Sequence, residues 1–215
     1  MNIMLTRLLM SVLSSVVVLV GPALAEDAAP VSYQTCVACH GTAGQGNAAL
    51  QAPALAGQDA AYIERQLRHF KAGVRGSDPA DILGAQMRPM VAALADTDMT
   101  AIAVWLAGQA RPVVAVTHKG NVKNGNDYFH SKCDACHGAW GEGNSLLNAP
   151  GIAWLDAAYL KRQYANFQSG VRGSHSDDTY GLQMQMMSKV LPQDSDLDDI
   201  IAYMQARAGA ESAAQ

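Results

Sequence analysis

The chain of 215 residues is poor in positive charge, in cysteine and in long apolar runs. Its 15 lysines and arginines are outnumbered by 19 aspartates and glutamates, which gives a formal net charge of −4 at pH 7. A nucleic-acid partner would require a basic patch, so we expect no nucleic acid among the partners. Outside the N-terminal segment, no apolar run is long enough to span a membrane. Regular alternation of apolar and polar residues is also missing, so we expect no substantial β-sheet.

The N-terminal segment has the three parts of a secretory signal peptide. Arg7 supplies the positive charge before a mostly apolar stretch from Leu8 to Val20, and Ala23-Leu24-Ala25 has the A-x-A pattern of a cleavage site. The apolar run is too short for a spanning helix, so an uncleaved membrane anchor is the less favoured alternative. We therefore predict a signal peptide over residues 1–25, export to the periplasm, and no stable membrane insertion of the mature protein.

The few cysteines of the chain all lie in two copies of one motif, Cys-x-x-Cys-His. The copies consist of Cys36, Cys39 and His40, and of Cys133, Cys136 and His137. Two thiols at this spacing can each add to one vinyl group of a haem, and the histidine is then held beneath the iron as an axial ligand. A redox dithiol should lie beside a βαβ pattern, which is missing, and a zinc site of four thiolates would leave both histidines without a role. The motifs therefore predict two covalently bound haem c groups.

The two motifs belong to an internal repeat in which Cys133 follows Cys36 by 97 residues. At this offset Ala52-Pro53 aligns with Ala149-Pro150, and the sequence Gly-Val-Arg-Gly-Ser recurs at residues 73–77 and 170–174. Two copies are too few for a solenoid, so the repeat predicts two small domains, each folded around its own haem.

The boundary between the copies is marked by Pro112, which ends the preceding helix. The valine-rich residues 113–116 that follow could form an extended connector or a small strand, and we prefer the connector. We expect the first domain over residues 26–110, a linker over residues 111–122 and the second domain over residues 123–215.

Apolar residues recur at helical spacing in matching places of the two units, so the fold class is mainly α. The expected helices cover residues 59–72 and 98–108 of the first unit and residues 124–129, 156–168 and 195–208 of the second. Before the first haem motif, residues 26–34 contain Pro30 and show no clear periodicity. The first helix of the first unit should therefore be short or irregular.

Each unit also repeats a methionine at a constant distance from its haem-binding histidine. Met87 follows His40 by 47 residues, and Met184 follows His137 by 47 residues. A thioether is a soft ligand suited to ferrous iron, and a histidine–methionine pair raises the reduction potential and leaves no open position on the iron.

A second methionine, Met90 or Met187, repeats in each unit as well, so repetition alone cannot choose the ligand. Pro89 favours a helix that starts at this position, which would place Met87 in the loop before the helix and Met90 on the helix. A loop methionine reaches over a haem more readily, so we prefer Met87 and, by the repeat, Met184 as metal ligands.

The remaining candidate site residues are four histidines and two arginines that recur at the offset of the repeat. Structural roles are expected for His69, His118, His130 and His175, because none recurs at the offset of the repeat. His175 lies near Met184 in sequence and is the alternative axial ligand. Arg75 and Arg172 recur, and their planar guanidinium groups could each bind a haem propionate. The other interpretation is a solvated arginine in a surface turn.

These motifs resemble those of cytochrome c4, a family of dihaem c-type cytochromes, over essentially all of the mature chain. The resemblance is also carried by Ala52, Pro53, Gly57, Gln58, Tyr62 and Met87-x-x-Met90 with Leu94-x-Asp96. It implies that the first methionine of each pair is the ligand, and that the carbonyl groups of Pro53 and Pro150 orient the haem-binding histidines. It also implies two domains packed about a pseudo-twofold axis, with haem propionates facing each other. The chain departs from the family in Ser32, which stands where the second unit has Phe129, and in Trp154.

The resemblance implies a periplasmic protein that shuttles single electrons between respiratory or dehydrogenase donors and an oxidase or reductase acceptor. Its partners would be redox proteins, and it would have no enzymatic reaction of its own. One alternative is the electron-accepting subunit of a sulfide or thiosulfate dehydrogenase. A dihaem peroxidase or a gas sensor would need an iron with an open position, and the paired methionines argue against both.

Overall fold

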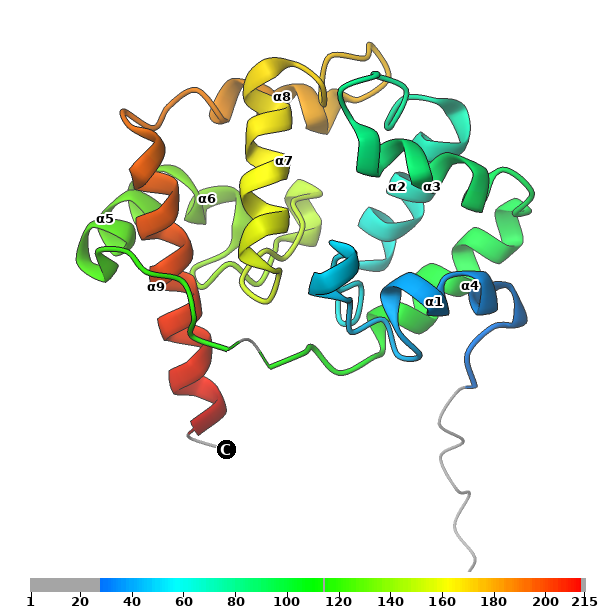
Figure 1. Ribbon diagram of the computed structural model, residues 1–215, viewed down its shortest axis with the longest axis horizontal. Coiled ribbons are helices and arrows are strands. Elements are labelled where there is room, and N and C mark those ends of the chain that lie inside the picture. Colours follow the sequence, from blue (N-terminus) through cyan, green and yellow to red (C-terminus); the bar gives the residue numbers. More distant parts are fainter. Residues whose placement is uncertain (1–27, 114, 214–215) are drawn as a thin grey trace, which may run out of the picture.

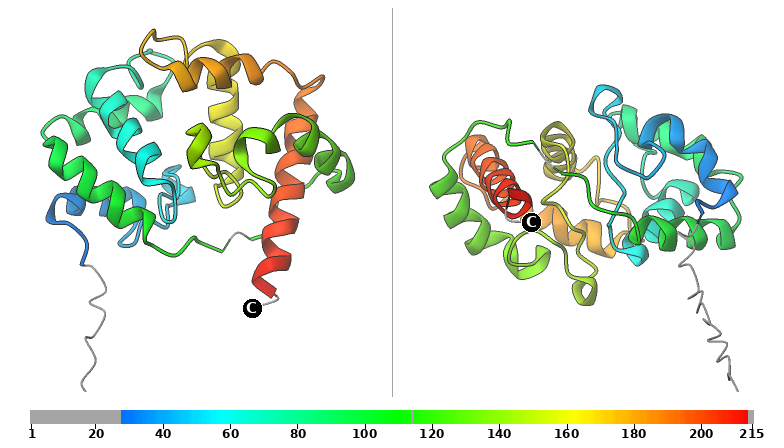
Figure 2. Two further views of the ribbon diagram at one scale, coloured as in Figure 1. Left: turned by 180° about the vertical axis from the view of Figure 1, so that it is seen from behind. Right: turned by 90° about the horizontal axis from the view of Figure 1, so that it is seen from below.

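The computed structural model describes residues 28–113 and 115–213, so the predicted signal peptide over residues 1–25 lies outside the described part (Figure 1). The elements described there are α-helices and short 3-10 helices, with two isolated β-bridges and no longer strand. The prediction of a mainly α fold is confirmed. Two units lie side by side, and an extended connector runs along one edge between them (Figures 1 and 2).

Among the described residues, the first unit contains six elements in chain order. They are η1 (Val31–Thr35), α1 (Val37–His40), η2 (Ala48–Leu50), α2 (Ala60–Ala72), α3 (Ile82–Val91) and α4 (Asp96–Ala107). Helix α2 begins where Asp59 accepts a hydrogen bond from the Tyr62 amide at 2.8 Å and ends at Gly73, whose φ of 77° suits a residue without a side chain. Its apolar side packs against α3 and α4.

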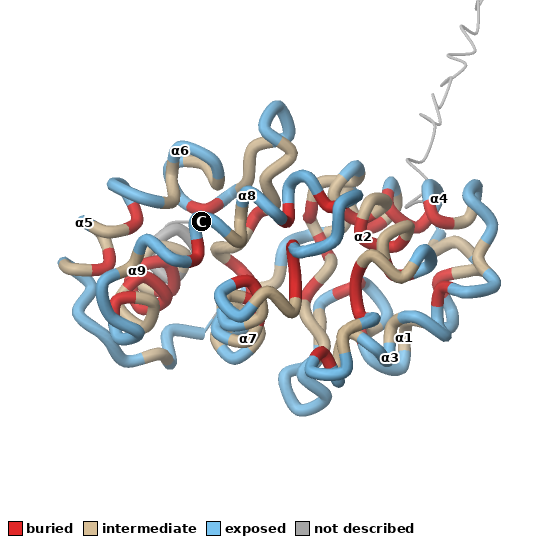
Figure 3. The backbone as a smooth tube through the Cα atoms, turned by 90° about the horizontal axis from the view of Figure 1, so that it is seen from above, coloured by how far each residue is buried: buried red, intermediate tan, exposed pale blue. Residues whose placement is uncertain are grey.

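The second unit repeats the same order with longer terminal helices. Its elements are α5 (Val122–Lys132), α6 (Asp134–His137), η3 (Ser145–Leu147), α7 (Ala157–Ser169), α8 (Thr179–Met187) and α9 (Asp194–Ala213). Helix α9 packs along α5, and α7 packs against α8. Buried residues concentrate on α9, around α2 and α4, and where the units meet (Figure 3).

The helix before the first haem motif is reduced to the single 3-10 turn η1, as the sequence predicts. Its Tyr33 is fully buried, and its ring packs against that of Trp105 with a centroid distance of 4.7 Å and an angle of 50° between the ring planes. In the second unit Phe129 and Tyr203 make the equivalent contact at 5.6 Å. Tyr33 therefore fills the place of Phe129 with a shift of one residue from the expected alignment on Ser32.

The connector between α4 and α5 is fixed to the second unit by its last residues. The backbone amides of Thr117 and His118 donate to Oε1 of Gln205, and His118 Nε2 lies 2.8 Å from Asp198 Oδ1. The described residues of the valine-rich run form no strand. Among the helices described, none is by itself long and apolar enough to cross a membrane, and α3 with α4 meets that test only as a pair bent by 118°.

Candidate functional site

Each Cys-x-x-Cys-His motif forms one turn of helix, α1 in the first unit and α6 in the second. The amide of His40 donates to the carbonyl of Cys36 at 2.8 Å, and His137 donates to Cys133 at 3.0 Å. Because residues three apart lie on the same side of a helix, this turn presents both thiols of a motif in one direction. In the described part of the chain all four thiols are free, and no cluster of three or more histidine, cysteine or carboxylate groups could hold a metal ion.

The two histidines are each held by one proline carbonyl. His40 Nδ1 lies 2.9 Å from the carbonyl oxygen of Pro53, and His137 Nδ1 lies 2.8 Å from that of Pro150. A carbonyl can only accept, so Nδ1 carries the proton and donates it. Burial lowers the pKa of both histidines, and these hydrogen bonds oppose the shift only in part. Each imidazole is therefore neutral, with an Nε2 lone pair left for a metal ion.

The glycine-rich loop after each motif brings the proline segment close to the histidine. Gly46 has a φ of 82°, and its amide donates to the carbonyl of His40 at 2.9 Å. A Cβ atom at Gly46 would lie 2.6 Å from the backbone nitrogen of Ala54, next to Pro53. Only glycine therefore permits this approach, and Gly143 has the same role in the second unit with a φ of 93°.

The methionines lie in helices, which corrects one sequence prediction. Met87 and Met90 are both in α3, so the expectation of Met87 in a loop before a helix starting at Pro89 is wrong. Asp81 begins the helix earlier, because its carboxylate accepts from the amide of Gly84 at 3.0 Å. Pro89 lies inside the helix near its last residue, Val91, and it removes the backbone hydrogen bond that the carbonyl group of Ala85 would otherwise accept.

Burial, rather than a loop position, distinguishes the two methionines of each pair. Met87 packs against the hydrophobic core of the first unit, whereas Met90 is 45% exposed. In the second unit Met184 is half-buried and Met187 is exposed. Burial therefore favours the first methionine of each pair as the one that faces a bound group.

A cavity of about 410 Å³ opens beside the second motif and reaches the boundary between the units. The predicted site residues of the second unit that line it are Cys133, Cys136, His137, Pro150, Arg172 and Met184. A haem c would need two thiols for its vinyl groups, an imidazole and a thioether for its iron, and a guanidinium for a propionate. The Nε atoms of Arg172 and Arg75 are buried without a hydrogen-bond partner, so each has a donor to spare for a carboxylate. The residues present fit the predicted cofactor.

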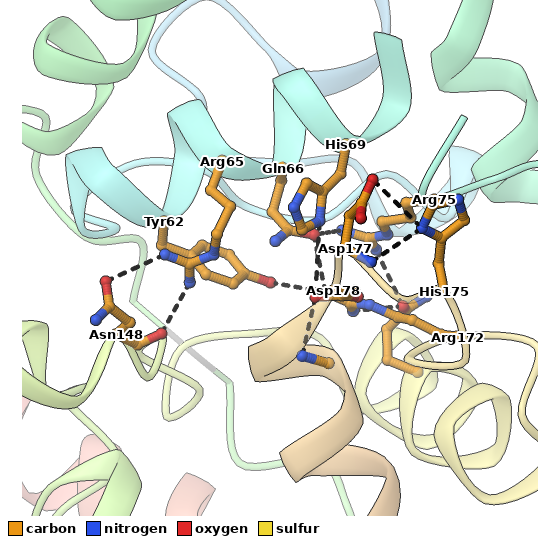
Figure 4. Close-up of polar contacts among 12 residues, drawn as sticks. Tyr62, Arg65, Gln66, His69, Arg75, Asn148, Arg172, His175, Asp177 and Asp178 are labelled. Carbon is orange, nitrogen blue, oxygen red and sulfur yellow. Dashed lines mark hydrogen bonds and ion pairs between the residues drawn. The ribbon is translucent and has the colours of Figure 1, made fainter. Parts of the chain in front are cut away.

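The two repeated arginines meet at the centre of the interface between the units, in what we call the arginine–glutamine ring (Figure 4). Its members are Arg75, Gln66, Arg172 and Gln163. Arg75 donates to Gln66 at 2.7 Å and to Gln163 at 3.0 Å, and Arg172 donates to Gln163 at 2.8 Å and to Gln66 at 2.9 Å. Both arginines are only 8% exposed, so neither is a solvated turn residue.

Further pairs around the ring repeat across the interface with the same two-fold relation. Arg65 donates to the carbonyl oxygen of Asn148 at 2.8 Å, and Arg162 donates to that of Gln51 at 3.0 Å. One further contact across the interface is not repeated: the side-chain amide of Gln58 both donates to and accepts from the backbone of Gly151, at 2.8 and 2.9 Å, and Leu155 stands at the equivalent position of the second unit. The reciprocal contacts of the ring and of the pairs Arg65–Asn148 and Arg162–Gln51 establish the predicted pseudo-twofold arrangement of the units.

Sequence reasoning assigned no role to Gln66 and Gln163, although both recur at the offset of the repeat. The sequence offered one signal for their role, because each is a polar residue that recurs among the apolar residues of a helix. Burial of a glutamine side chain requires hydrogen-bond partners, and here those partners come from the other domain. The ring could not be located without the docked arrangement of the two units.

The four unrepeated histidines lie outside the cavity beside the second motif. His69 Nδ1 lies 3.7 Å from Asp178 Oδ1 across the interface, and burial lowers the pKa of this histidine. His130 contacts Asp134 and the hydroxyl group of Tyr203. His175 is exposed and accepts a hydrogen bond from the amide two residues further on, so it does not compete with Met184 in this cavity.

Comparison with known proteins agrees with this geometry. Residues 25–110 and 122–208 each match the family model of cytochrome c. A thiosulfate dehydrogenase electron acceptor from Stutzerimonas stutzeri (strain A1501) is 31% identical over 173 residues, which are 76% of this chain and 76% of that protein. A cytochrome c4 from Stutzerimonas stutzeri is 32% identical over 151 residues, which are 66% of this chain and 71% of that protein.

A solved structure shares the arrangement of both units. The crystal structure of reduced recombinant cytochrome c4 from Pseudomonas stutzeri matches this chain with a TM-score of 0.65 and 28% identity. The match covers 80% of this chain and 93% of that chain. The protein is thus a c-type cytochrome with two cytochrome c domains in tandem. It belongs to the cytochrome c family, in its dihaem cytochrome c4 branch, and its two haem c groups serve electron transfer.

Proposed function

We propose that the protein is a periplasmic carrier of single electrons in which each iron is closed by one histidine and one methionine. The ligands would be His40 and Met87 in the first domain and His137 and Met184 in the second. The observation that carries this proposal is the cavity in which His137, Met184 and both thiols of the second motif converge. Residues 1–25 have the pattern of a signal peptide, which supports export. We also propose the domain limits predicted from the sequence, residues 26–110 and 123–215.

Each side chain has a defined task toward the haem. The bound haem supplies an iron that alternates between the ferric and ferrous states. The cysteine thiols of each motif hold the group covalently, and the proline carbonyl fixes the imidazole with Nε2 unprotonated. Arg75 and Arg172 offset propionate charge at the interface between the domains. Two closed irons leave no position for a substrate, so we propose no enzymatic reaction.

A specific observation favours a dehydrogenase as one redox partner. A relative is named as an electron acceptor of thiosulfate dehydrogenase, and the second domain carries an apolar rim around its cavity. This crevice rim consists of Leu146, Leu147, Met187 and Val190, which are exposed and also line the cavity. We propose that a thiosulfate dehydrogenase docks on the crevice rim. Electrons cross efficiently only over short distances, so the dehydrogenase must bind where the haem of the second domain lies near the protein surface.

Two of the four equivalent positions in the first domain carry smaller apolar side chains, whereas Leu50 and Met90 match Leu147 and Met187. At the offset of the repeat, Leu146 aligns with Ala49, and Val190 aligns with Ala93. Leu146 is 91% exposed at the mouth of the cavity that it lines, and Ala49 offers a much smaller apolar surface at the equivalent position. The asymmetry supports exchange with this partner through the second domain.

Replacement of Leu146 by glutamate tests the crevice rim. We expect Leu146→Glu to slow reduction by the thiosulfate dehydrogenase of Stutzerimonas stutzeri (strain A1501) about tenfold, because a charge in an apolar interface costs on the order of 1.4 kcal/mol or more. Val104→Glu is the matched control, since Val104 is 61% exposed on α4 and does not line the cavity. Reduction by ascorbate should be equal in all three proteins. Equal rates with the dehydrogenase would contradict docking at the rim.

A further inference from the structure

Each of the two methionine helices begins at a buried aspartate. Asp81 caps α3, and its Oδ1 accepts a hydrogen bond from a backbone amide of the first turn at 3.0 Å. Asp178 caps α8 in the same way, at 2.9 Å, and the two aspartates are only 3% and 4% exposed. Met87 and Met184 each follow their aspartate by six residues. The position of each aspartate therefore fixes the start of the helix that carries the proposed ligand.

Each aspartate is also contacted by a side chain of the other domain. Asn166 on α7 donates from Nδ2 to Asp81 Oδ1 at 3.3 Å, so the second domain contacts the methionine helix of the first. The residue equivalent to Asn166 at the offset of the repeat is His69 on α2. His69 Nδ1 lies 3.7 Å from Asp178 Oδ1, so the first domain approaches the methionine helix of the second (Figure 4).

The two contacts occupy equivalent places but differ in chemistry. An amide is a neutral donor at every pH, whereas an imidazole gains a positive charge when it is protonated. The side chain of His69 is 13% exposed, and its Nδ1 is buried without a hydrogen-bond partner among the described residues. A distance of 3.7 Å is longer than a hydrogen bond, so the neutral imidazole leaves the contact with Asp178 incomplete. Protonation adds an attraction between opposite charges that draws the two groups together.

The charges near His69 act in opposite directions. They belong to one carboxylate and three guanidinium groups, those of Asp178, Arg65, Arg172 and Arg75. Burial has the largest effect and lowers the pKa of His69, the carboxylate raises it, and the guanidinium groups lower it. In the loop before α8, His175 and Asp177 lie 3.9 Å from each other and are exposed, so solvent screens their charges. His69 is therefore neutral at neutral pH and takes up a proton only below the ordinary pKa of a histidine.

We propose that His69 is a positioning residue for the second haem site, whose protonation completes the contact with Asp178 and fixes the start of α8 against the first domain. The inference rests on the proposed ligation of the two irons by Met87 and Met184. A helix is a rigid element, so a displacement of Asp178 is passed to Met184, about 9 Å further along α8. The surroundings of Met184 thus respond to pH through a residue of the other domain. Those of Met87 do not, because Asn166 holds the first methionine helix at every pH.

The test is a pH titration of the reduced holoprotein, followed by proton NMR from about pH 8 to about pH 5. Low-spin ferrous haem is diamagnetic, and its ring current moves the methyl signal of a ligating methionine away from all other signals. Each domain then gives one such signal, which the Met87→Ala and Met184→Ala variants assign. We expect the Met184 signal to shift with pH in the wild type and to lose this step in His69→Asn. The haem propionates are the same in both proteins, so the difference isolates His69.

Asn166→His is the reciprocal variant, and it should transfer the pH-dependent step to the signal of Met87. His69→Asn is the matched change in the other direction, because it copies the pair that Asn166 already forms with Asp81. Loss of the Met184 step in His69→Asn supports the proposal. The conclusion does not depend on Asn166→His, so misfolding of that variant leaves the test intact.

Two results would contradict different parts of the account. Equal pH profiles of the Met184 signal in the wild type and in His69→Asn would overturn the positioning role, even if the variant is less stable. His69 would then only fill space at the interface. A wild-type protein that lacks the two shifted methionine signals would instead overturn the proposed ligation of the irons, on which the inference rests.

Discussion

Replacement of Met184 by alanine will lower the reduction potential of the second haem by roughly 0.1 V or more, within the range of about 0.8 V that axial ligands can span. Loss of the thioether removes the soft ligand that stabilises ferrous iron. It also leaves one position on the iron open. The reduced variant should therefore bind carbon monoxide at one haem per chain, measured by the change in its optical spectrum.

Met187→Ala is the matched control for this experiment. Met187 lies on the same helix and lines the same cavity, but it is more exposed than Met184. Its replacement should leave the potential and the carbon monoxide response close to those of the wild type. The pair Met87→Ala and Met90→Ala should repeat the contrast in the first domain. A carbon monoxide response in Met187→Ala and not in Met184→Ala would reverse the assignment of the ligand.

Replacement of Gln66 by leucine will lower the free energy of unfolding by about 3 kcal/mol, since it removes one acceptor from each of two buried guanidinium groups. Gln66 accepts from both Arg75 and Arg172, and no water replaces it easily in a buried interface. Gln163→Leu should have a similar effect, because it occupies the equivalent position of the ring. Denaturant unfolding followed by circular dichroism measures the change.

Gln168→Leu provides the control for a change from glutamine to leucine on the same kind of helix. Gln168 lies exposed on α7, so its replacement should change the free energy of unfolding by less than about 0.5 kcal/mol. The double variant of Gln66 and Gln163 should lose less than the sum of the two single losses, because both residues serve the same arginines. A Gln66→Leu variant as stable as the Gln168→Leu control would show that the ring does not hold the domains together.

The haem attachment sites could be predicted from the sequence because their chemistry is local. The two thiols and the histidine of each motif lie on one helical turn, so their spacing alone determines how they meet a haem. The resemblance to cytochrome c4 predicted the contact of His40 with Pro53, which depends on a loop that is present in both copies of the repeat. Arg75 and Arg172 were found because both recur at one offset.

The prediction that Met87 lies in a loop was wrong because two local rules for the start of a helix conflict. Pro89 prefers the first turn of a helix, but the side chain of Asp81 caps the same helix earlier. Both signals are present in the sequence, and only the packed structure decides between them. Tyr33 is a comparable case, because a one-residue shift lets it fill the place of Phe129 while the repeat alignment pointed to Ser32.

The interface was the least predictable part of the site. Gln66 contacts Arg172, and Gln58 contacts Gly151, so each pair joins residues that are far apart in sequence. No local pattern encodes such a pair, and its partners follow only from the way in which the two domains dock. Once the pseudo-twofold axis is known, a contact between residues that recur in both units, such as that of Gln66 with Arg172, predicts its counterpart, that of Gln163 with Arg75.

The central claim, two closed irons that only carry electrons, is tested most directly by the optical spectrum of the oxidised and reduced holoprotein, with carbon monoxide added to the reduced form. We expect two haems per chain, a weak long-wavelength band from methionine-to-ferric charge transfer at both, and no response to carbon monoxide. A missing band, or a spectral shift with carbon monoxide at either haem, would mean an open or differently ligated iron and would contradict the proposed carrier function.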